Sequence, residues 1–266
     1  MNDRTNRLSR MLAVDIGNTN IECGIFEGDQ LVTSWRLSST MPFTGDECWQ
    51  SVSFFCRESQ QIDPHQLDAV VIASVVPSHT CSFVTMTEKW LRIKPLIISV
   101  EACPFIQILY DNPEQVGADR LCNVAAGIHH YGGPLIVVDF GTAVTFDVIS
   151  LEGAYLGGII IPGPQAMATG LHSRTSQLPK VSLKFPNSII GVTTEHGIRS
   201  GITWGIVDMI DGLIERINDQ LGAATQVIAT GGYAQTYASH SNHFTKVHPD
   251  LVLEGIRIIY ERIKKQ

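Results

Sequence analysis

Two aspartates stand at the ends of similar apolar runs, one near the start of the chain and one near its middle. Asp15 follows Met-Leu-Ala-Val and precedes Ile-Gly-Asn-Thr-Asn, whereas Asp139 follows Leu-Ile-Val-Val and precedes Phe-Gly-Thr. In both places a second apolar run follows the turn and ends at Glu-Gly, at residues 27–28 and 152–153. An internal repeat of this kind predicts two similar halves, each opening with a hairpin whose turn carries an aspartate.

The residue types around both aspartates suit a phosphate group. Gly17 and Gly141 have no side chain at the bend, so backbone N–H groups can approach a ligand closely. Successive N–H groups in such a turn form a concave site for phosphate oxygens. A carboxylate beside phosphate needs a cation between them, and Mg²⁺ joins the two while it keeps several waters. Short polar side chains surround both bends: Asn18, Thr19 and Asn20 in one copy, Thr142 and Thr145 in the other.

Two interpretations of these turns are open. Each hairpin could be an ordinary tight turn in which Asp and Asn make local Asx turns. The matched pair instead predicts two turns that face each other and hold a polyphosphate from both sides. A single copy would favour the ordinary turn, whereas the pair favours phosphate.

The overall composition is that of a globular protein. The chain has 266 residues, of which 44% are hydrophobic and 17% charged, enough to bury one large core or two smaller ones. The net charge of −7 gives no general attraction to nucleic acid or to acidic membranes, and the sequence contains no basic patch. We therefore predict neither a nucleic-acid partner nor a membrane partner.

The cysteines and the first residues bear on the cellular compartment. All six cysteines lie in the first half of the chain without a Cys-x-x-Cys pair, which indicates free thiols in a reducing compartment. Residues 1–10 are polar and lack the apolar core of a signal peptide. No apolar run approaches the roughly 20 residues of a membrane span. The sequence therefore predicts a soluble, cytoplasmic protein.

Hydrophobic periodicity predicts the elements that must position the first turn. Three antiparallel strands are followed by helices that alternate with buried strands, an arrangement typical of an α/β fold. The run 67–76 is too apolar to have a solvent-exposed face, so it is predicted to be central and parallel. Strands are expected at 11–17, 21–27, 30–37, 67–76 and 95–100, and helices at 45–60, 78–90 and 121–130.

The second half repeats this order and adds a long helix. Gly197, Gly201 and Gly205 interrupt that helix, and each glycine lowers its stability. Their presence suggests that something packs close to the helix backbone. Strands are expected within 135–149, from 155 and at 225–230, a loop at 171–194, and helices at 194–221 and from Pro249 to Tyr260.

Two halves of this βββαβαβα type resemble the actin/hexokinase/Hsp70-like ATPase fold, an α/β fold with duplicated ribonuclease H-like halves. The resemblance implies an N-terminal ATPase-like half at 11–131 and a C-terminal one at 132–266. In that fold the phosphates lie between the halves, and a Gly-Gly turn of the second half contacts adenosine. Gly231 and Gly232 occur where that turn is expected.

A fuller set of motifs resembles one family of that fold. In chain order they are Asp15-Ile-Gly-Asn-Thr-Asn, Tyr110-Asp-Asn-Pro, Gly117-Ala-Asp-Arg, Asp139-Phe-Gly-Thr, Gly157-Gly-Ile-Ile-Ile-Pro-Gly, Leu178-Pro and Gly231-Gly. This order is similar to that of type III pantothenate kinases, over nearly the whole chain from Met11. The resemblance implies ATP-dependent phosphorylation of pantothenate to 4′-phosphopantothenate, the first step of coenzyme A biosynthesis. It further implies Mg²⁺, a monovalent cation (K⁺ or NH₄⁺) and a homodimer with substrate pockets near its interface.

The resemblance also assigns roles to individual residues. Asp119 is the implied catalytic base, which orients the pantothenate hydroxyl and accepts its proton late in the attack. Asp139 is implied to hold the monovalent cation, and Asp15 to bind Mg²⁺ through the phosphates. ATP contacts are implied for Asp15, Ile16, Gly17, Asn18, Thr19, Asn20, Ile21, Glu22, Thr142, Gly231 and Gly232. Substrate contacts are implied for Tyr110, Gly117, Ala118, Asp119, Arg120 and Thr194, with Arg120 suited to the pantothenate carboxylate.

Each assignment has an ordinary structural alternative. Asp119 and Arg120 could be an acid that interacts with the helix dipole and a surface arginine. Tyr110 could be a loop aromatic packed for its area, and Thr194 could be a helix N-cap.

Two segments depart from the family pattern, and two other functions are open. Val192 stands where many members have Lys, and His196-Gly-Ile-Arg-Ser-Gly replaces the commoner Met-Gln-Ser-Gly, both on the pantothenate side. A non-catalytic nucleotide-binding regulator or accessory factor on the same fold is the main alternative function. Another small-molecule kinase is the second. The presence of Asp15 and Asp119 favours an enzyme.

Overall fold

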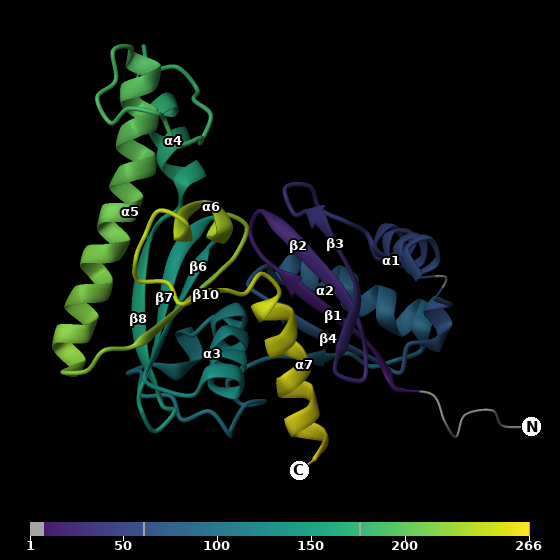
Figure 1. Ribbon diagram of the computed structural model, residues 1–266. Coiled ribbons are helices and arrows are strands. Elements are labelled where there is room, and N and C mark those ends of the chain that lie inside the picture. The colour runs from purple at the N-terminus through teal and green to yellow at the C-terminus, as the bar shows by residue number, and fades with distance from the viewer. Residues whose placement is uncertain (1–7, 61, 176, 266) are drawn as a thin grey trace, which may run out of the picture. The chain divides into compact units, whose positions relative to one another are not determined.

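The computed structural model describes residues 8–60, 62–175 and 177–265 (Figure 1). Its contacts divide the chain into two compact units. Among the described residues, unit 1 comprises 8–107, 111–129 and 251–265, and unit 2 comprises 108–110 and 130–250. Most of the polar leader, residues 1–7, lies outside the described residues.

Unit 1 is built on a five-stranded sheet with the order β3-β2-β1-β4-β5. The strands are β1 (Arg10–Ile16), β2 (Asn20–Glu27), β3 (Gln30–Ser38), β4 (Ala69–Ser74) and β5 (Leu96–Ile97). The first three form the predicted antiparallel meander, and β4 lies parallel to β1. Residues 69–73 of β4 are all buried, which confirms the prediction of a central parallel strand.

Helices accompany this sheet in unit 1. They are α1 (Gly45–Gln60), α2 (Pro77–Met86), α3 (Ala118–Tyr131) and α7 (Leu251–Lys264), with short 3₁₀ turns at Pro64–Gln66 and Pro113–Gln115. The predicted helix up to residue 90 changes after Met86 into a five-residue π-helix (Thr87–Leu91), which ends at Arg92 with φ +60°. Val52 and Cys56 of α1 and Phe83 of α2 pack into the core.

The last helix belongs to unit 1, whereas the sequence predicts that the second half continues to residue 266. α7 packs against β1, β2 and β4. A Cβ atom on Gly255 would collide with the backbone carbonyl of Cys122 in α3, so the two helices approach at backbone distance. Glycine is required at this crossing because the neighbouring atom cannot rotate away. The helix begins at Leu251, so Pro249 precedes it by two residues and is not its first residue.

Unit 2 repeats the architecture with a sheet of order β10-β9-β6-β7-β8. The strands are β6 (Leu135–Phe140), β7 (Ala143–Ile149), β8 (Tyr155–Pro162), β9 (Gln226–Thr230) and β10 (Lys246–Val247). β6, β7 and β8 form an antiparallel meander, and β9 lies parallel to β6. Strand for strand, this is the order found in unit 1, so the predicted internal repeat is confirmed.

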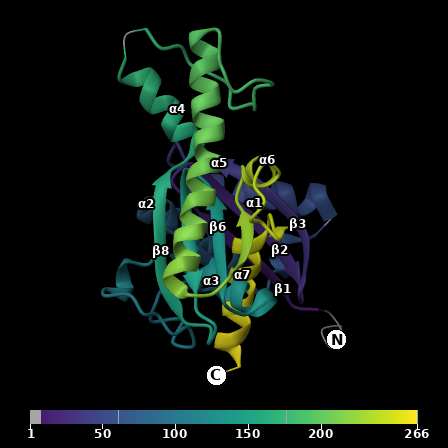
Figure 2. The same ribbon diagram turned by 60° about the vertical axis from the view of Figure 1, so that its left-hand side comes forward.

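Three helices complete unit 2: α4 (Pro164–Ser173), α5 (Thr194–Leu221) and α6 (Ala234–Ala238). Ile206, Ile210 and Ile214 of α5 are buried in the core cluster of the sheet. The first part of α5 projects with α4 beyond the ends of the strands of the sheet (Figures 1 and 2). In the described part of the chain, no helix combines the length and apolar character needed to cross a membrane.

Candidate active site

Unit 1 carries the first predicted turn, between β1 and β2. The Gly17 amide donates to the carbonyl of Asn20 (N···O 3.0 Å), and a Cβ atom on Gly17 would lie 3.2 Å from that oxygen. The carbonyl of Thr19 accepts from the Ser39 amide (2.9 Å), which ties the turn to the end of β3. The turn is tight, as the sequence predicts, and the side chains of Asn18, Thr19 and Asn20 are exposed.

Asp15 is half-buried next to this turn. Its register partner on β2 is Glu22, whose carboxylate accepts a hydrogen bond from the Arg36 guanidinium (2.9 Å). Glu22 is therefore already balanced by a cation. Ile16 and Ile21 are fully buried, so only their backbone groups can contact a ligand.

Asp119 lies in the first turn of α3, where the helix dipole favours a negative charge. Its Oδ1 accepts a hydrogen bond from the backbone amide of Arg120 (2.8 Å). A Cβ atom at position 117 would collide with this oxygen, so Gly117 allows the carboxylate to fold back over the chain. Arg120 is only 7% exposed, which excludes the alternative of a surface arginine.

The thiol of Cys122, one turn into α3, lies near two carboxylates. Burial raises its pKa well above the usual range, and the negative charges of Asp15 and, more weakly, Asp119 raise it further. Two charges on different elements therefore act on one buried group. Both aspartates of unit 1 thus lie within electrostatic range of one buried thiol, which their separation in sequence does not reveal.

A cleft of about 320 Å³ lies beside the start of α3. It is at the carboxyl ends of the parallel strands β4 and β5, where open α/β sheets bind their ligands. Of the residues that line it, the sequence analysis predicts only Gly117 and Ala118. A signal that could have found two others is a serine at or shortly after the end of an apolar strand, as at Ser74 and Ser99. The cleft is lined by Ser74, Ile98, Ser99, Val100, Glu101, Glu114, Gln115, Val116, Gly117 and Ala118.

Unit 2 carries the second predicted turn, between β6 and β7. The Gly141 amide donates to the carbonyl of Ala143 (3.0 Å), and Asp139 pairs in register with Thr230 of β9. The next residue, Gly231, has φ +88°, and a Cβ atom there would collide with Oδ1 of Asp139. Only glycine fits this position, so the predicted Gly-Gly turn lies directly against the carboxylate.

The start of α4 also holds this turn. The Gly163 amide donates to the carbonyl of Thr142 (3.1 Å), and a Cβ atom on Gly163 would collide with the carbonyls of Gly141 and Thr142. Asp139, Thr142 and Gly231 are thus brought together in unit 2. A carboxylate with turn carbonyls nearby is a set of hard oxygen donors, which suits a cation such as K⁺ or Mg²⁺.

Two predicted substrate residues lie at opposite ends of unit 2. Tyr110 is half-buried, with its ring close to Gly157 near the start of β8. Thr194 is the exposed first residue of α5, on the part that projects beyond the other end of β8 (Figure 1). The N-cap is Thr193, which accepts from the His196 amide (3.2 Å), so the alternative that Thr194 is the cap is wrong. One copy of the chain does not bring Thr194 to Tyr110.

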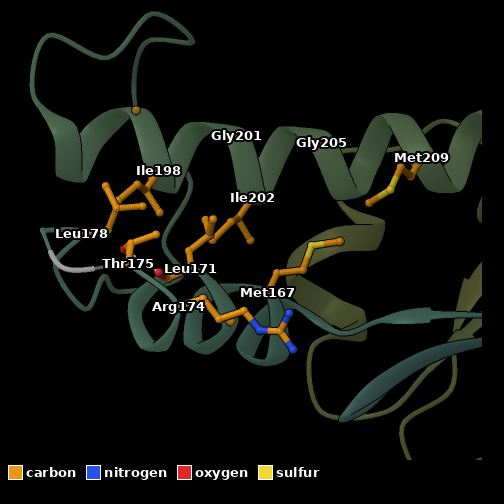
Figure 3. Close-up of a pocket in the computed structure, with 12 residues that line it drawn as sticks. Met167, Leu171, Arg174, Thr175, Leu178, Ile198, Gly201, Ile202, Gly205 and Met209 are labelled. Carbon is orange, nitrogen blue, oxygen red and sulfur yellow. Dashed lines mark hydrogen bonds between the residues drawn. The ribbon is translucent and has the colours of Figure 1, made fainter.

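An apolar groove of about 880 Å³ runs between α4 and α5 in unit 2 (Figure 3). Met167 and Leu171 of α4, with Arg174 directly after it, face Ile198 and Ile202 of α5 across the groove. The sequence predicts close packing at three glycines of α5: Gly197, Gly201 and Gly205. In the part of the chain that the structure describes, a Cβ atom added to any of them would meet nothing within 4 Å. For Gly201 and Gly205, none of the elements that the structure describes therefore supplies the close packing that the sequence suggests.

The comparisons with known sequences agree on one family. A family model described as type III pantothenate kinase matches residues 11–216. The type III pantothenate kinase of Dehalococcoides mccartyi is 40% identical over 95% of this chain and 97% of its own length. That of Myxococcus xanthus is 41% identical over 95% of this chain and 98% of its own length.

Solved structures share the fold at low sequence identity. The activator of the 2-hydroxyisocaproyl-CoA dehydratase from Clostridium difficile, with bound ADPNP, has a TM-score of 0.57 at 16% identity and covers 96% of both chains. MreB 5 of Spiroplasma citri, bound to AMPPNP, has a TM-score of 0.53 at 12% identity and covers 97% of both. These likenesses confirm the predicted actin/hexokinase/Hsp70-like ATPase fold.

Proposed function

Because this chain belongs to the type III pantothenate kinase family, we propose that Asp119 is the base with which it phosphorylates pantothenate. The chain is accordingly an ATP-dependent kinase of coenzyme A biosynthesis. The observation that supports the proposed base is the position of Asp119 in the first turn of α3, directly after Gly117 and Ala118, which line the cleft; its charge and that of Asp15 both act on the Cys122 thiol. This arrangement supports Asp119 as a proton acceptor in the same unit as the proposed phosphate-binding turn.

In the proposed reaction the primary hydroxyl of pantothenate attacks the γ-phosphorus of ATP, and ADP leaves. An alcohol is a very weak acid, so the carboxylate of Asp119 orients the hydroxyl and takes its proton only as the new O–P bond forms. Phosphoryl transfer depends chiefly on positioning and on neutralising charge. The hydrogen bond from the Arg120 amide holds Oδ1, and Oδ2 is the proposed proton acceptor.

The ATP phosphates are proposed to bind to the two repeated turns. Because the Gly17 and Gly141 amides already donate within their own turns, the proposed N–H donors are the neighbouring turn amides of residues 18–19 and Thr142, and Gly231 and Gly232 are proposed to contact adenosine. Asp15 would hold Mg²⁺ through the phosphates, and Asp139 would hold K⁺ or NH₄⁺ with nearby carbonyls. These cations would supply the positive charge that a Walker lysine supplies elsewhere, since the sequence has no Gly-Lys-Ser/Thr motif.

Tyr110, Gly117, Ala118, Arg120 and Thr194 are proposed to bind pantothenate. Arg120 is buried beside Asp119, where a guanidinium can pair with the pantothenate carboxylate. The exposed Val192 near Thr194 contributes no charge, so the affinity for pantothenate must come from the other contacts. We also propose that the protein acts in the cytoplasm.

The proposal is tested by incubating the purified full chain with ATP, Mg²⁺ and pantothenate and measuring ADP. We expect ADP to form only when pantothenate is present, to stop when EDTA removes Mg²⁺, and to rise when KCl replaces NaCl. A chain that binds ATP but forms no ADP with pantothenate would instead be a non-catalytic regulator. Equal rates in KCl and NaCl would contradict the cation role of Asp139.

The chain is further proposed to form a homodimer through the groove between α4 and α5. Leu171 and Met209, which line the groove, have exposed apolar side chains, and the segment that leads into α5 exposes three more: Ile189, Ile190 and Val192. The open faces of Gly201 and Gly205 would let a helix of a second copy approach closely. A two-fold interface here would also place Thr194 of each copy next to the other copy.

We expect Gly201→Leu to convert the dimer into a monomer. The new side chain has room within its own chain but would fill the groove that the second copy needs. Light scattering of the purified variant measures the mass directly. The matched control is Gly212→Leu, because Gly212 lies in the same helix with nothing within 4 Å and does not line the groove. A Gly201→Leu variant that stays dimeric would contradict this interface.

A further inference from the structure

Residues 108–110 belong to unit 2, although the chain up to residue 107 and from residue 111 to 129 belongs to unit 1. Ile108 pairs with Tyr155 as an isolated parallel bridge, and the Leu109 amide donates to the Tyr155 carbonyl (2.8 Å). The segment thus adds to the edge of the sheet at the start of β8. This attachment determines where the Tyr110 ring lies on unit 2.

The ring of Tyr110 lies on a surface built by two residues of β8. It is nearly parallel to the ring of Tyr155, with centroids 6.4 Å apart and planes inclined by 14°. A Cβ atom on Gly157 would lie 3.3 Å from both Cδ2 and Cε2 of Tyr110, which is closer than side chains normally pack. Gly157 also has φ +111°, a backbone conformation that other residues rarely adopt.

The Tyr155 side of this surface is rigid. Tyr155 is fully buried, and its hydroxyl donates to Oδ1 of Asp147 (3.0 Å), which is itself fully buried. The register of β7 and β8 shifts between Val148 and Ile149, so that Tyr155 and Gly157 oppose adjacent residues of β7. Bulges of this kind re-aim side chains next to functional sites. A buried hydrogen bond and a bulge together fix the position of the Tyr155 ring.

We infer that Tyr155 and Gly157 are positioning residues that hold the Tyr110 ring in the orientation in which it contacts pantothenate. The inference rests on the proposed role of Tyr110 as a substrate contact. The ring is half-buried, so one face rests on β8 while part of it remains accessible. A fixed aromatic ring loses little conformational freedom when a substrate packs on it.

The test uses the full-length kinase with pantothenate and ATP varied separately. Gly157→Ala places a methyl group against the ring, and we expect the KM for pantothenate to rise about fivefold, as for loss of an aromatic contact. The KM for ATP should not change. Gly222→Ala is the matched control for backbone strain, because Gly222 has φ +63° and nothing lies within 4 Å of its added Cβ.

A second pair of variants separates positioning from folding. Tyr155→Leu removes the ring beneath Tyr110 and should raise the KM for pantothenate, whereas Tyr155→Phe keeps the ring and should restore most of the affinity. Thermal unfolding of each variant shows whether it remains folded at the assay temperature. If Tyr155→Leu binds pantothenate as the parent does, the inference is wrong.

A double-mutant cycle distinguishes failure of this inference from failure of the proposed function. In a Tyr110→Ala background, Gly157→Ala should have no further effect on the KM for pantothenate, since the ring it displaces is gone. If Tyr110→Ala raises that KM but Gly157→Ala adds to it independently, Tyr110 keeps its proposed role and the positioning inference is overturned. If Tyr110→Ala leaves the KM for pantothenate unchanged, the proposed role of Tyr110 is wrong, and so is the inference that depends on it.

Discussion

Replacing Asp119 with Asn is expected to lower kcat by about 100-fold to 10,000-fold, the usual contribution of a positioned proton acceptor. The amide has nearly the same shape and can still accept the hydrogen bond from the Arg120 amide, so the start of α3 should be preserved. It cannot take the proton of the attacking hydroxyl. The KM values for ATP and pantothenate should change far less than kcat, because the substrates are held by other groups.

Steady-state kinetics at saturating ATP measures this effect, and Asp29→Asn is the matched control. Asp29 is an exposed aspartate in the turn between β2 and β3 of the same unit. The control should retain full kcat and the same melting temperature as the parent. An Asp119→Asn enzyme that works at the full rate would rule out this residue as the base.

Replacing Gly255 with Val is expected to destabilise the protein by about 3 kcal/mol or more. The added atoms would meet the carbonyl of Cys122, which belongs to the backbone of α3 and cannot rotate away. Either α7 must move off the sheet of unit 1 or α3 must shift, and α3 carries Asp119. The loss of stability should therefore be accompanied by a loss of activity.

Urea unfolding followed by circular dichroism measures the change in midpoint. Gly212→Val is the control, because it makes the same substitution in a helix where nothing lies within 4 Å. Valine favours a helix slightly more than glycine does, so the control midpoint should stay the same or rise. Equal midpoints for the two variants would show that the contact between α7 and α3 is unimportant.

The sequence predicts most of the fold because its signals are local. The two hairpins around Asp15 and Asp139 repeat the same residue types, and their sheets have the same strand order. The apolar run of β4 predicts its central position in the same way. Burial on both faces leaves a clear pattern along a single strand.

Features that depend on contacts between distant segments could not be predicted. The apolar face of α7 shows that this helix must pack on something, but not that the sheet of unit 1 is its partner. The walls of the cleft come from three separate segments, and only the one around Gly117 and Ala118 carries a recognisable motif. The same applies to Tyr110, whose place on Gly157 depends on a single bridge to β8.

The return of α7 to unit 1 also affects the order in which the protein can assemble during its synthesis. Residues 130–250 form almost all of unit 2 as one continuous segment, so they can fold as soon as they leave the ribosome. The sheet of unit 1 is translated earlier, yet the helix that packs on it, at 251–264, is translated only after unit 2. The unit that carries Asp15 and Asp119 is therefore begun before unit 2 and completed after it, and a nascent chain holds no finished unit 1 until residues 251–264 have been translated.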